Sequence, residues 1–455
     1  MTRTAPADTF DRTLIVPMIL GSVLNPINSS IIAVSLVPIG RAFGAPPSQT
    51  AWLVSALYLA TSIGQPVAGR LVDIYGPRRV FLAGTSVAGV AGVIGVVAPN
   101  LGVLIIARVL LGFGTCAGYP AAMYLIRSEA RRTGQDSPGG VLTALAVANQ
   151  TIAVIGPTLG GLLIGLGGWR STIAINIPLS AACLIVGRLR LPRTPMPERG
   201  APARLDFAGV GLFAGTLVSL LLFLMSPQID HIYLLAITAA AAATFTLCEL
   251  RVADPFLDLR VFGGNVPLLL TYCRGLFAYI VSYAFLYGYT QWLEEGRGLS
   301  ASHAGLALLP LFGIAIVVST TTGRRKEIRG KLLIGAIGQL VACAMLLLLS
   351  GDSAIWLLVA IVAVLGIPQG LNSLALQNAV YYQADPERIG AAAGLLRTFS
   401  YLGAIVAAAA SGAFFPHRAD TGGLHHLAWF LMVMAVLFFA VTVLDRSLRR
   451  KTPVA

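Results

Sequence analysis

Three arginines inside long apolar stretches are the side chains with which this sequence could do chemistry. The sequence reveals no acidic partner for Arg108, Arg274 or Arg397. An unpaired arginine at a bilayer centre costs at least about 2.5 to 3.5 kcal/mol, so we expect each guanidinium to face the protein interior, water or a partner. Backbone carbonyl contacts, or extension to the membrane surface, are the structural alternative. If these cations face a cavity, that cavity is expected to accept neutral or anionic amphiphiles.

Amides and tyrosines in the same stretches could line a binding site. Tyr272, Tyr279, Tyr283 and Tyr287 recur at seven- and four-residue spacing, which predicts an aromatic face on one helix that suits planar compounds. Tyr287, near the expected outer end, could instead belong to an aromatic belt. The amides are expected to hydrogen-bond a substrate or to join neighbouring helices; they are Asn25, Asn28, Asn149, Gln150, Gln369 and Asn372.

The composition excludes several functional classes. The net charge is +13, but only 11% of the 455 residues are charged and the mean hydropathy is +0.80, which excludes a soluble nucleic-acid binder. No phosphate-binding loop and no pair of nucleophile and base can be found, so we expect neither ATP-driven transport nor enzyme activity. The cysteines lack paired spacing and the histidines fit no standard metal site, so we expect no cofactor and no metal.

Apolar segments of membrane-spanning length divide the chain. About 25 of the 32 Lys and Arg residues fall in alternate loops, which predicts a multi-pass protein of the cell membrane with both termini in the cytoplasm. The polar start, with Asp8 and Asp11, predicts an uncleaved first span. The expected fold is all-α, with fourteen helices near 14–39, 49–71, 80–98, 101–127, 140–166, 170–190, 207–226, 232–250, 264–292, 303–322, 331–350, 354–381, 389–415 and 425–445.

A short repeat suggests an internal duplication. The segment from Gly69 to Gly76 matches the segment from Gly323 to Gly330 at Gly, Arg, acid, Ile and Gly positions. We therefore expect a six-helix bundle in residues 1–191, a linker with two inserted helices in 192–260, and a second six-helix bundle in 261–455. Two such bundles with a binding site between them are the architecture of alternating access.

At these motifs the chain resembles the major facilitator superfamily, in particular its fourteen-helix drug:proton antiporter branch. Gly69, Asp73, Gly76, Arg78 and Arg79 match the signature loop between helices 2 and 3. Glycine permits a tight turn there, and Asp73 can cap a helix or pair with arginine. The resemblance implies that this loop latches the two bundles in one orientation. A plain turn held at the membrane surface by its charges is the alternative.

Helix 5 carries a second matching motif. Gly156, Pro157, Gly160 and Gly161 resemble the signature of exporters in this superfamily. Proline removes a backbone hydrogen bond and bends a helix, while the glycines let another helix approach closely. A packing kink without a transport role is the alternative. Arg108 with Gly112 and Gly114, Asp206 with Gly209, and Arg397 with Gly403 add weaker matches.

The chain departs from this branch at the group that should carry the proton. Asn28 stands where the branch has an acidic residue in helix 1, and asparagine cannot titrate. No other carboxylate is expected near mid-membrane, although antiport needs a group that gains and loses a proton. The resemblance implies a monomeric exporter of small amphipathic compounds in exchange for protons. The alternatives are a facilitator or exchanger of one anionic or neutral metabolite, and a sensor that does not transport.

Overall fold

The computed structural model describes residues 10–133, 139–193, 206–252, 255–257, 259–322, 327–385, 389–445 and 447–449. Within these ranges the chain forms helices and no β-strand. The first group of helices comprises α1 (Ile15–Ile31), α2 (Leu36–Phe43), α3 (Pro47–Tyr75), α4 (Pro77–Val96), α5 (Leu101–Thr115), α6 (Gly118–Thr133), α7 (Gly139–Gly167), α8 (Trp169–Ala174) and α9 (Asn176–Arg190).

A hairpin and a second group follow. The hairpin consists of α10 (Phe207–Met225) and α11 (Tyr233–Arg251). The second group comprises α12 (Val266–Ala284), a π-helical turn (Phe285–Tyr289), α13 (Thr290–Glu295), α14 (Ala301–Ala307), α15 (Leu309–Thr322), α16 (Ile328–Leu346), α17 (Ile355–Gln383), α18 (Ile389–Phe414) and α19 (Thr421–Leu444).

Twelve helical segments in the described ranges are long and apolar enough to cross a membrane, so the expected count of fourteen is not confirmed by this criterion. The helices α3 and α7 do not meet it, although each has 29 residues. Several side chains of α7 lie outside the described residues, and the apolar stretch found there is Ile155–Gly167. In α3, polar residues such as Gln65, Arg70 and Asp73 lower the mean hydropathy.

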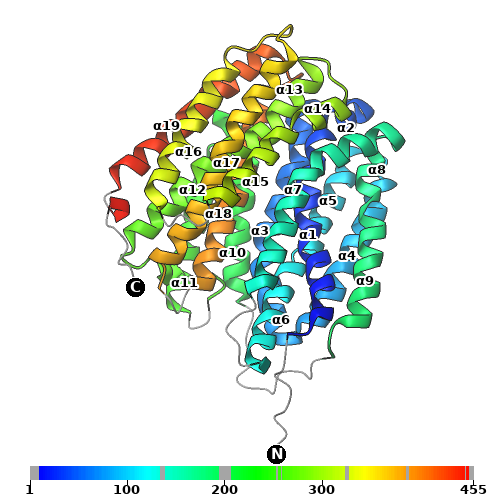
Figure 1. Ribbon diagram of the computed structural model, residues 1–455, viewed down its shortest axis with the longest axis vertical. Helices are drawn as coiled ribbons and strands as arrows, with labels where there is room; N and C mark the ends of the chain where they lie inside the picture. The colour runs from blue at the N-terminus through cyan, green and yellow to red at the C-terminus, as the bar shows by residue number, and fades with distance from the viewer. Residues whose placement is uncertain are drawn as a thin grey trace, which may run out of the picture.

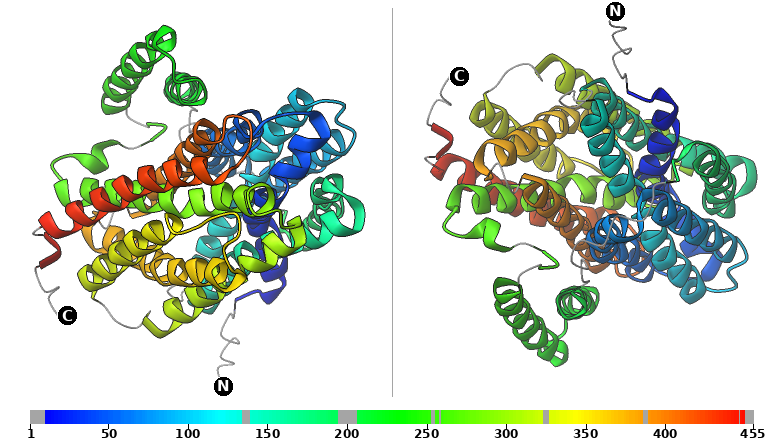
Figure 2. Two further views of the ribbon diagram at one scale, coloured as in Figure 1. Left: turned by 90° about the horizontal axis from the view of Figure 1, so that it is seen from above. Right: turned by 90° about the horizontal axis from the view of Figure 1, so that it is seen from below.

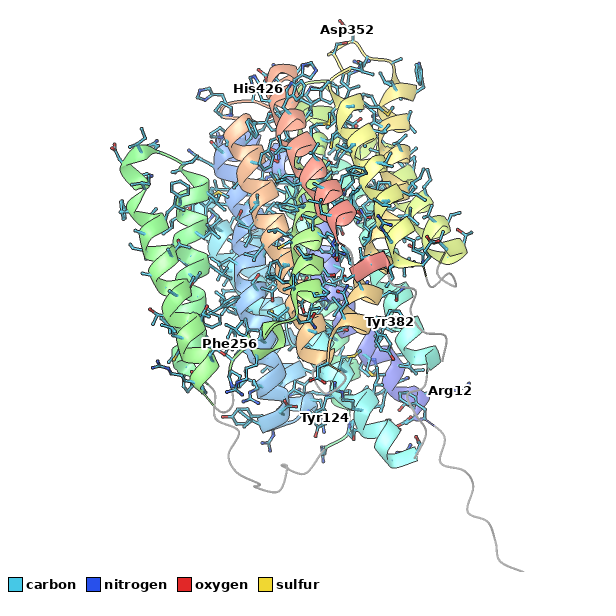
Figure 3. The ribbon with its side chains drawn as sticks, turned by 90° about the vertical axis from the view of Figure 1, so that its left-hand side faces the viewer. Arg12, Tyr124, Phe256, Asp352, Tyr382 and His426 are labelled. Carbon is cyan, nitrogen blue, oxygen red and sulfur yellow. The ribbon has the colours of Figure 1, made fainter. Side chains whose placement is uncertain are left out.

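The helices run between two ends of the molecule. Arg12 and Tyr124 lie at one end, which we call the near side, and Asp352 and His426 lie at the other, the far side (Figure 3). The two groups stand beside each other (Figure 1), joined chiefly where α3 packs on α18 and α7 packs on α14. The α10–α11 hairpin lies on the flank of both groups (Figure 2).

Four helices expected to be continuous are each broken into two segments. The breaks follow α1, α5, α8 and α14. In every case a proline lies in the first turn of the second segment, where its missing N–H leaves no bond unmade. The proline ring also clashes with the carbonyl four residues earlier, which falls at or next to the break. These prolines are Pro38, Pro120, Pro178 and Pro310. In contrast, α7 runs through Pro157 as one helix.

Arg274 has an acidic partner that the sequence does not reveal. Its guanidinium forms an ion pair with Asp445, which follows the last turn of α19, and both side chains are buried. The pair joins α12 to the near end of α19, apart from the binding path in which the sequence placed Arg274. Two guanidinium nitrogens, Nε and Nη1, have no hydrogen-bond partner in the described part of the chain.

We predict that Arg274→Met or Asp445→Asn alone lowers the free energy of unfolding by about 3 to 5 kcal/mol, because each leaves one buried charge without its partner. The double variant Arg274→Met with Asp445→Leu should recover most of that loss, since it removes both desolvation costs. Thermal melts of the purified variants in detergent measure the effect. Additive losses in the double variant would show that the two charges do not depend on each other.

Candidate functional site

The break after α1 places four backbone carbonyls in the centre of the protein without partners inside their own helix. Each of the four finds a donor. The carbonyl of Asn28 accepts from Arg108, and that of Ser29 accepts from the Tyr287 hydroxyl at 2.9 Å. The carbonyl of Ser30 accepts from the backbone N–H after the helix, and that of Ile31 accepts from the Ser35 hydroxyl. The broken helix is therefore a point where several elements converge.

Arg108 is buried and its guanidinium is satisfied by backbone alone. Nε donates to the Leu53 carbonyl at 3.0 Å, and both terminal nitrogens donate to the Asn28 carbonyl at 3.3 Å. No described residue forms an ion pair with it. For Arg108 the structure therefore shows the alternative given above, in which backbone carbonyls accept from the guanidinium. These hydrogen bonds join α5 to α1 and α3.

Asn28 directs its side chain away from Arg108 and toward α9. Its amide and that of Asn176 donate to each other's oxygens at 2.6 and 2.9 Å, and both are buried. Each amide also donates to a nearby carbonyl, from Asn28 to Leu24 in α1 and from Asn176 to Ile173 in α8. Asn28 stands where the resemblance to the drug:proton antiporters leads one to expect an acid, and here it forms an uncharged contact between α1 and α9.

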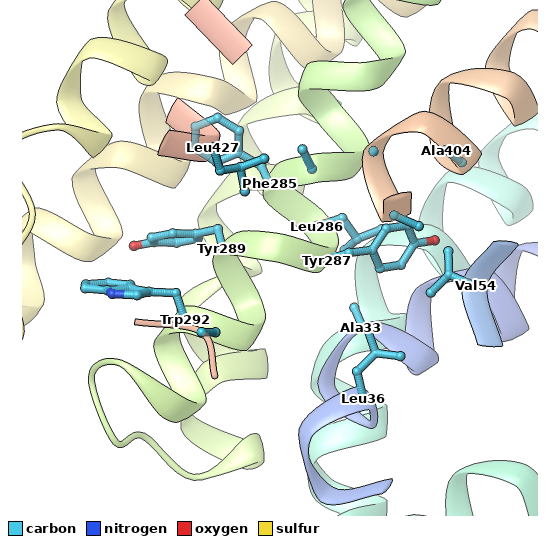
Figure 4. Close-up of a cluster of buried hydrophobic side chains, with 14 of the residues drawn as sticks. Ala33, Leu36, Val54, Phe285, Leu286, Tyr287, Tyr289, Trp292, Ala404 and Leu427 are labelled. Carbon is cyan, nitrogen blue, oxygen red and sulfur yellow. The ribbon is translucent and has the colours of Figure 1, made fainter. Parts of the chain in front are cut away.

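Tyrosines from both groups meet at mid-depth. The hydroxyls of Tyr58 in α3 and Tyr287 in the π-helical turn lie 2.9 Å apart. The ring of Tyr58 is 5.5 Å from that of Tyr283 and 5.7 Å from that of Tyr401, and the Tyr401 hydroxyl donates to Gln65. Figure 4 shows Tyr287 extending from the second group toward Val54 and Ala33 of the first. The aromatic face expected on this helix is thus an interface between the groups.

A cavity of about 130 Å³ lies between α1 and the second group. Ser29 and Ser30 contribute from the broken helix, and Tyr279, Tyr283 and Gln369 are predicted site residues that reach it. The lining contains hydroxyls, one amide and apolar side chains, with no charged group. The complete lining is Ser29, Ser30, Tyr279, Ser282, Tyr283, Leu286, Leu311, Phe312, Leu365 and Gln369.

The remaining predicted amides lie elsewhere. Asn25 donates to the hydroxyls of Thr61 and Thr115, so it joins α1 to α3 and α5. Asn372 is buried against Gly335 of α16, and its amide atoms have no hydrogen-bond partner in the described part of the chain. The side chains of Asn149 and Gln150 lie outside the described residues.

Arg397 lies between the groups. Its guanidinium carbon is 4.2 Å from the centre of the Tyr119 ring of α6, a cation–π contact from the second group to the first. Tyr279, Tyr283 and Tyr401 lie in its neighbourhood. Two of these tyrosines, Tyr279 and Tyr283, line the cavity, while Arg397 itself is not among its lining residues.

The glycines of α7 allow backbone contact on two sides. A Cβ on Gly156 or Gly160 would collide with α1 or the turn that follows it. On the opposite side, a Cβ on Gly161 would lie 2.7 Å from the Ala301 carbonyl and from the Ser302 Cα. The Ser302 hydroxyl donates to the Gly161 carbonyl at 2.7 Å, and Thr158 donates to that of Gly305. This α7–α14 contact, which we call the far-side seam, joins the two groups on the far side.

The near-side signature loop makes its described contacts within the first group. Gly76 has a φ of +83° and begins α4, a conformation that favours glycine. Arg78 donates to the Arg188 carbonyl of α9 at 2.9 Å. Asp73 is exposed, interacts with the charges of Arg70 and Arg127, and does not cap α4. Gly69 lies in open space and Arg79 is exposed.

Buried carboxyl groups occur away from the cavity. Glu294 of α13 is 3% exposed, and its Oε1 has no hydrogen-bond partner among the described residues. Its charge interacts with Arg41 of α2, across the two groups. Glu249 of α11 lies beside Asp206 at the start of α10, and each has one buried oxygen that no described donor reaches.

Sequence reasoning missed several site residues. Asn176, Tyr58 and Tyr401 belong to no recognisable motif, and their partners are more than 100 residues away in the chain. A signal did exist for Ser29 and Ser30, because Pro38 predicts a break in the helix just after them. As a whole, the site can hold a molecule by hydrogen bonds and aromatic contact. In the described ranges, no cluster of metal-binding side chains is found.

Comparisons with known proteins agree with this arrangement. Residues 18–408 match the family model of the Major Facilitator Superfamily. The chain is 29% identical to the uncharacterized MFS-type transporter YwoD of Bacillus subtilis, over 87% of this chain and 88% of that protein. It is 28% identical to the lincomycin resistance protein of Streptomyces lincolnensis, over 93% and 89%. It is also 28% identical to the multidrug resistance protein Stp of Mycobacterium tuberculosis, over 88% and 76%.

Solved structures show the same fold. A crystal structure of the nucleoside transporter NupG aligns with a TM-score of 0.63 at 12% identity, over 94% of this chain and 98% of that one. A structure of proton dependent oligopeptide transporters aligns with a TM-score of 0.66 at 15% identity, over 96% and 99%. Because the family model spans most of the chain and the helices adopt the fold of such transporters, this multi-pass membrane protein belongs to the Major Facilitator Superfamily.

Proposed function

We propose that this transporter exports small amphipathic compounds across the cell membrane by alternating access. The observation that carries the proposal is a cavity lined by both helix groups, which also meet on the far side through direct backbone contact between α7 and α14. Such a contact can part and re-form as the groups move. Relatives named for lincomycin and multidrug resistance support export of compounds of this kind.

The same proposal includes the orientation of the protein in the membrane, the division of its spans and its monomeric state. We place the near side, with both termini, in the cytoplasm, because the Lys and Arg residues concentrate in its loops. Counting α3 and α7 gives fourteen spans, arranged as a unit in residues 1–191, an insertion in 192–260 and a unit in 261–455. Each chain has its own cavity, so the transporter is proposed to act as a monomer.

Proton exchange is the proposed energy source, and the cavity itself offers no carrier among its lining residues. Glu294 is the first candidate, because it is buried where α13 of the second group meets α2 of the first. Its surroundings change when the groups move. The second candidate function, a facilitator or exchanger without protons, is favoured by the neutral Asn28–Asn176 joint at the position expected to be acidic.

We predict that Gly161→Ala disfavours the conformation with a closed far side by about 1 to 3 kcal/mol, because the added methyl group meets backbone atoms of α14 that cannot rotate away. The measurement is labelling of Ser29→Cys by a membrane-impermeant maleimide applied from the far side, with the five native cysteines replaced. Labelling should become faster.

Gly215→Ala in α10 is the matched control, since a Cβ there meets nothing within 4 Å. It should label at the parent rate. Equal rates for Gly161→Ala and the parent would remove the far-side seam from the mechanism.

We predict that a gradient of one pH unit, acidic on the far side, sustains about tenfold accumulation of substrate on that side in proteoliposomes, because one pH unit is worth 1.36 kcal/mol in a one-to-one exchange. The membrane potential is clamped at zero. Glu294→Gln should abolish accumulation while preserving downhill flux, and Glu249→Gln in the flanking hairpin should retain accumulation. Downhill flux without accumulation in the parent would identify the facilitator or exchanger instead.

A further inference from the structure

Arg397 carries a positive charge that the rest of the described structure does not neutralise. No described residue forms an ion pair or a hydrogen bond with its guanidinium, and it is partly exposed. The other two arginines inside spans already have partners: carbonyls accept from Arg108, and the charge of Arg274 is paired with Asp445. The donors of Arg397 are therefore free to bind a ligand.

The surroundings of Arg397 are aromatic and lead into the cavity. Tyr119 lies under the guanidinium, and Tyr279, Tyr283 and Tyr401 lie nearby. Tyr279 and Tyr283 also line the cavity, and their helix α12 packs on α18, which carries Arg397, so these two tyrosines lie between the cavity and the guanidinium. Flat aromatic walls favour a flat aromatic ligand.

The cavity lacks the group that would select cations. None of its ten lining residues is acidic, and the buried carboxyl groups in the described ranges lie at the far side, in the hairpin or paired with Arg274. A cationic ligand would leave water for a site with no opposite charge, which costs free energy. An anion, in contrast, would supply the missing partner of Arg397.

We propose that the substrates of this transporter are planar aromatic carboxylates, whose rings lie against Tyr279 and Tyr283 and whose carboxylate pairs with Arg397. A guanidinium and a carboxylate match geometrically and form charge-assisted hydrogen bonds. This inference rests on the proposed export function and specifies its substrate class.

The test compares three naphthalene compounds that share one ring system and differ in charge: 2-naphthoate, 2-naphthylmethanol and 2-naphthylmethylammonium. Binding is measured with the full-length protein in nanodiscs, and transport with the same protein in proteoliposomes. We expect 2-naphthoate to bind at least tenfold more tightly than the ammonium compound. Arg397→Gln should weaken 2-naphthoate about tenfold or more and leave the alcohol unchanged, because only the carboxylate uses the charge.

Two further variants separate binding from folding. Arg397→Lys keeps the charge and should keep the preference for 2-naphthoate at reduced affinity. Tyr119→Leu removes the ring below the guanidinium and should bind 2-naphthoate at least as well as the parent. The matched control is Arg170→Gln on the far side, which also removes an arginine stacked on an aromatic ring, at 4.4 Å from Trp169. It should change none of the three affinities.

Several results would overturn the inference. They are tighter binding of the ammonium compound by the parent, equal weakening of all three compounds by Arg397→Gln, and no detectable binding of 2-naphthoate at 1 mM. Transport of the ammonium compound but not 2-naphthoate would leave export standing and refute only this substrate class. Absence of flux for every compound, with 2-naphthoate still bound through Arg397, would refute export and keep the site.

Discussion

Backbone polar groups inside a membrane must find partners within the protein, and the break in α1 makes this requirement strict at one place. The carbonyl of Asn28 is satisfied by Arg108 of the same helix group, while that of Ser29 is satisfied by Tyr287 of the other group. The hydrogen bond from Arg108 to Asn28 therefore stays within one group, whereas the bond from Tyr287 to Ser29 depends on how the two groups are placed. Ser29 also lines the cavity, so a molecule bound in the cavity would lie next to the contact between the two helix groups.

Small residues and prolines determine where this architecture is rigid and where it can change. Proline in the first turn of a segment ends the preceding helix at a defined place, as Pro38 does after the cavity residues Ser29 and Ser30 and Pro310 does beside the far-side seam. Glycine then lets whole backbones touch, as at Gly161 and Gly305. Contacts of this kind bury little side-chain surface and consist of a few hydrogen bonds, such as that from Ser302 to Gly161. A seam of this composition can separate at modest cost.

The three arginines inside spans show how surroundings give one residue type different roles. Arg108 is a structural cross-link because carbonyls occupy its nitrogens, and Arg274 is a structural ion pair because Asp445 reaches it. Arg397 has a described contact with the Tyr119 ring, which attracts a cation but does not cancel its charge. The position of an arginine inside a span therefore does not reveal its role. The role follows from the atoms with which its guanidinium interacts.

The sequence by itself determined the all-helical membrane class and most helix positions, because hydropathy and helical periodicity act over one turn of chain. Three residues that it predicted for the binding path, Tyr279, Tyr283 and Gln369, line the cavity, and their role in binding stays a prediction. It also contained the signal for the four breaks in Pro38, Pro120, Pro178 and Pro310. Only the tertiary structure decided that Asn28 pairs with Asn176, that Arg274 pairs with Asp445, and that Tyr58 meets Tyr287. The residues of these three pairs are 148, 171 and 229 positions apart, respectively. No local sequence pattern predicts which distant helices will lie side by side.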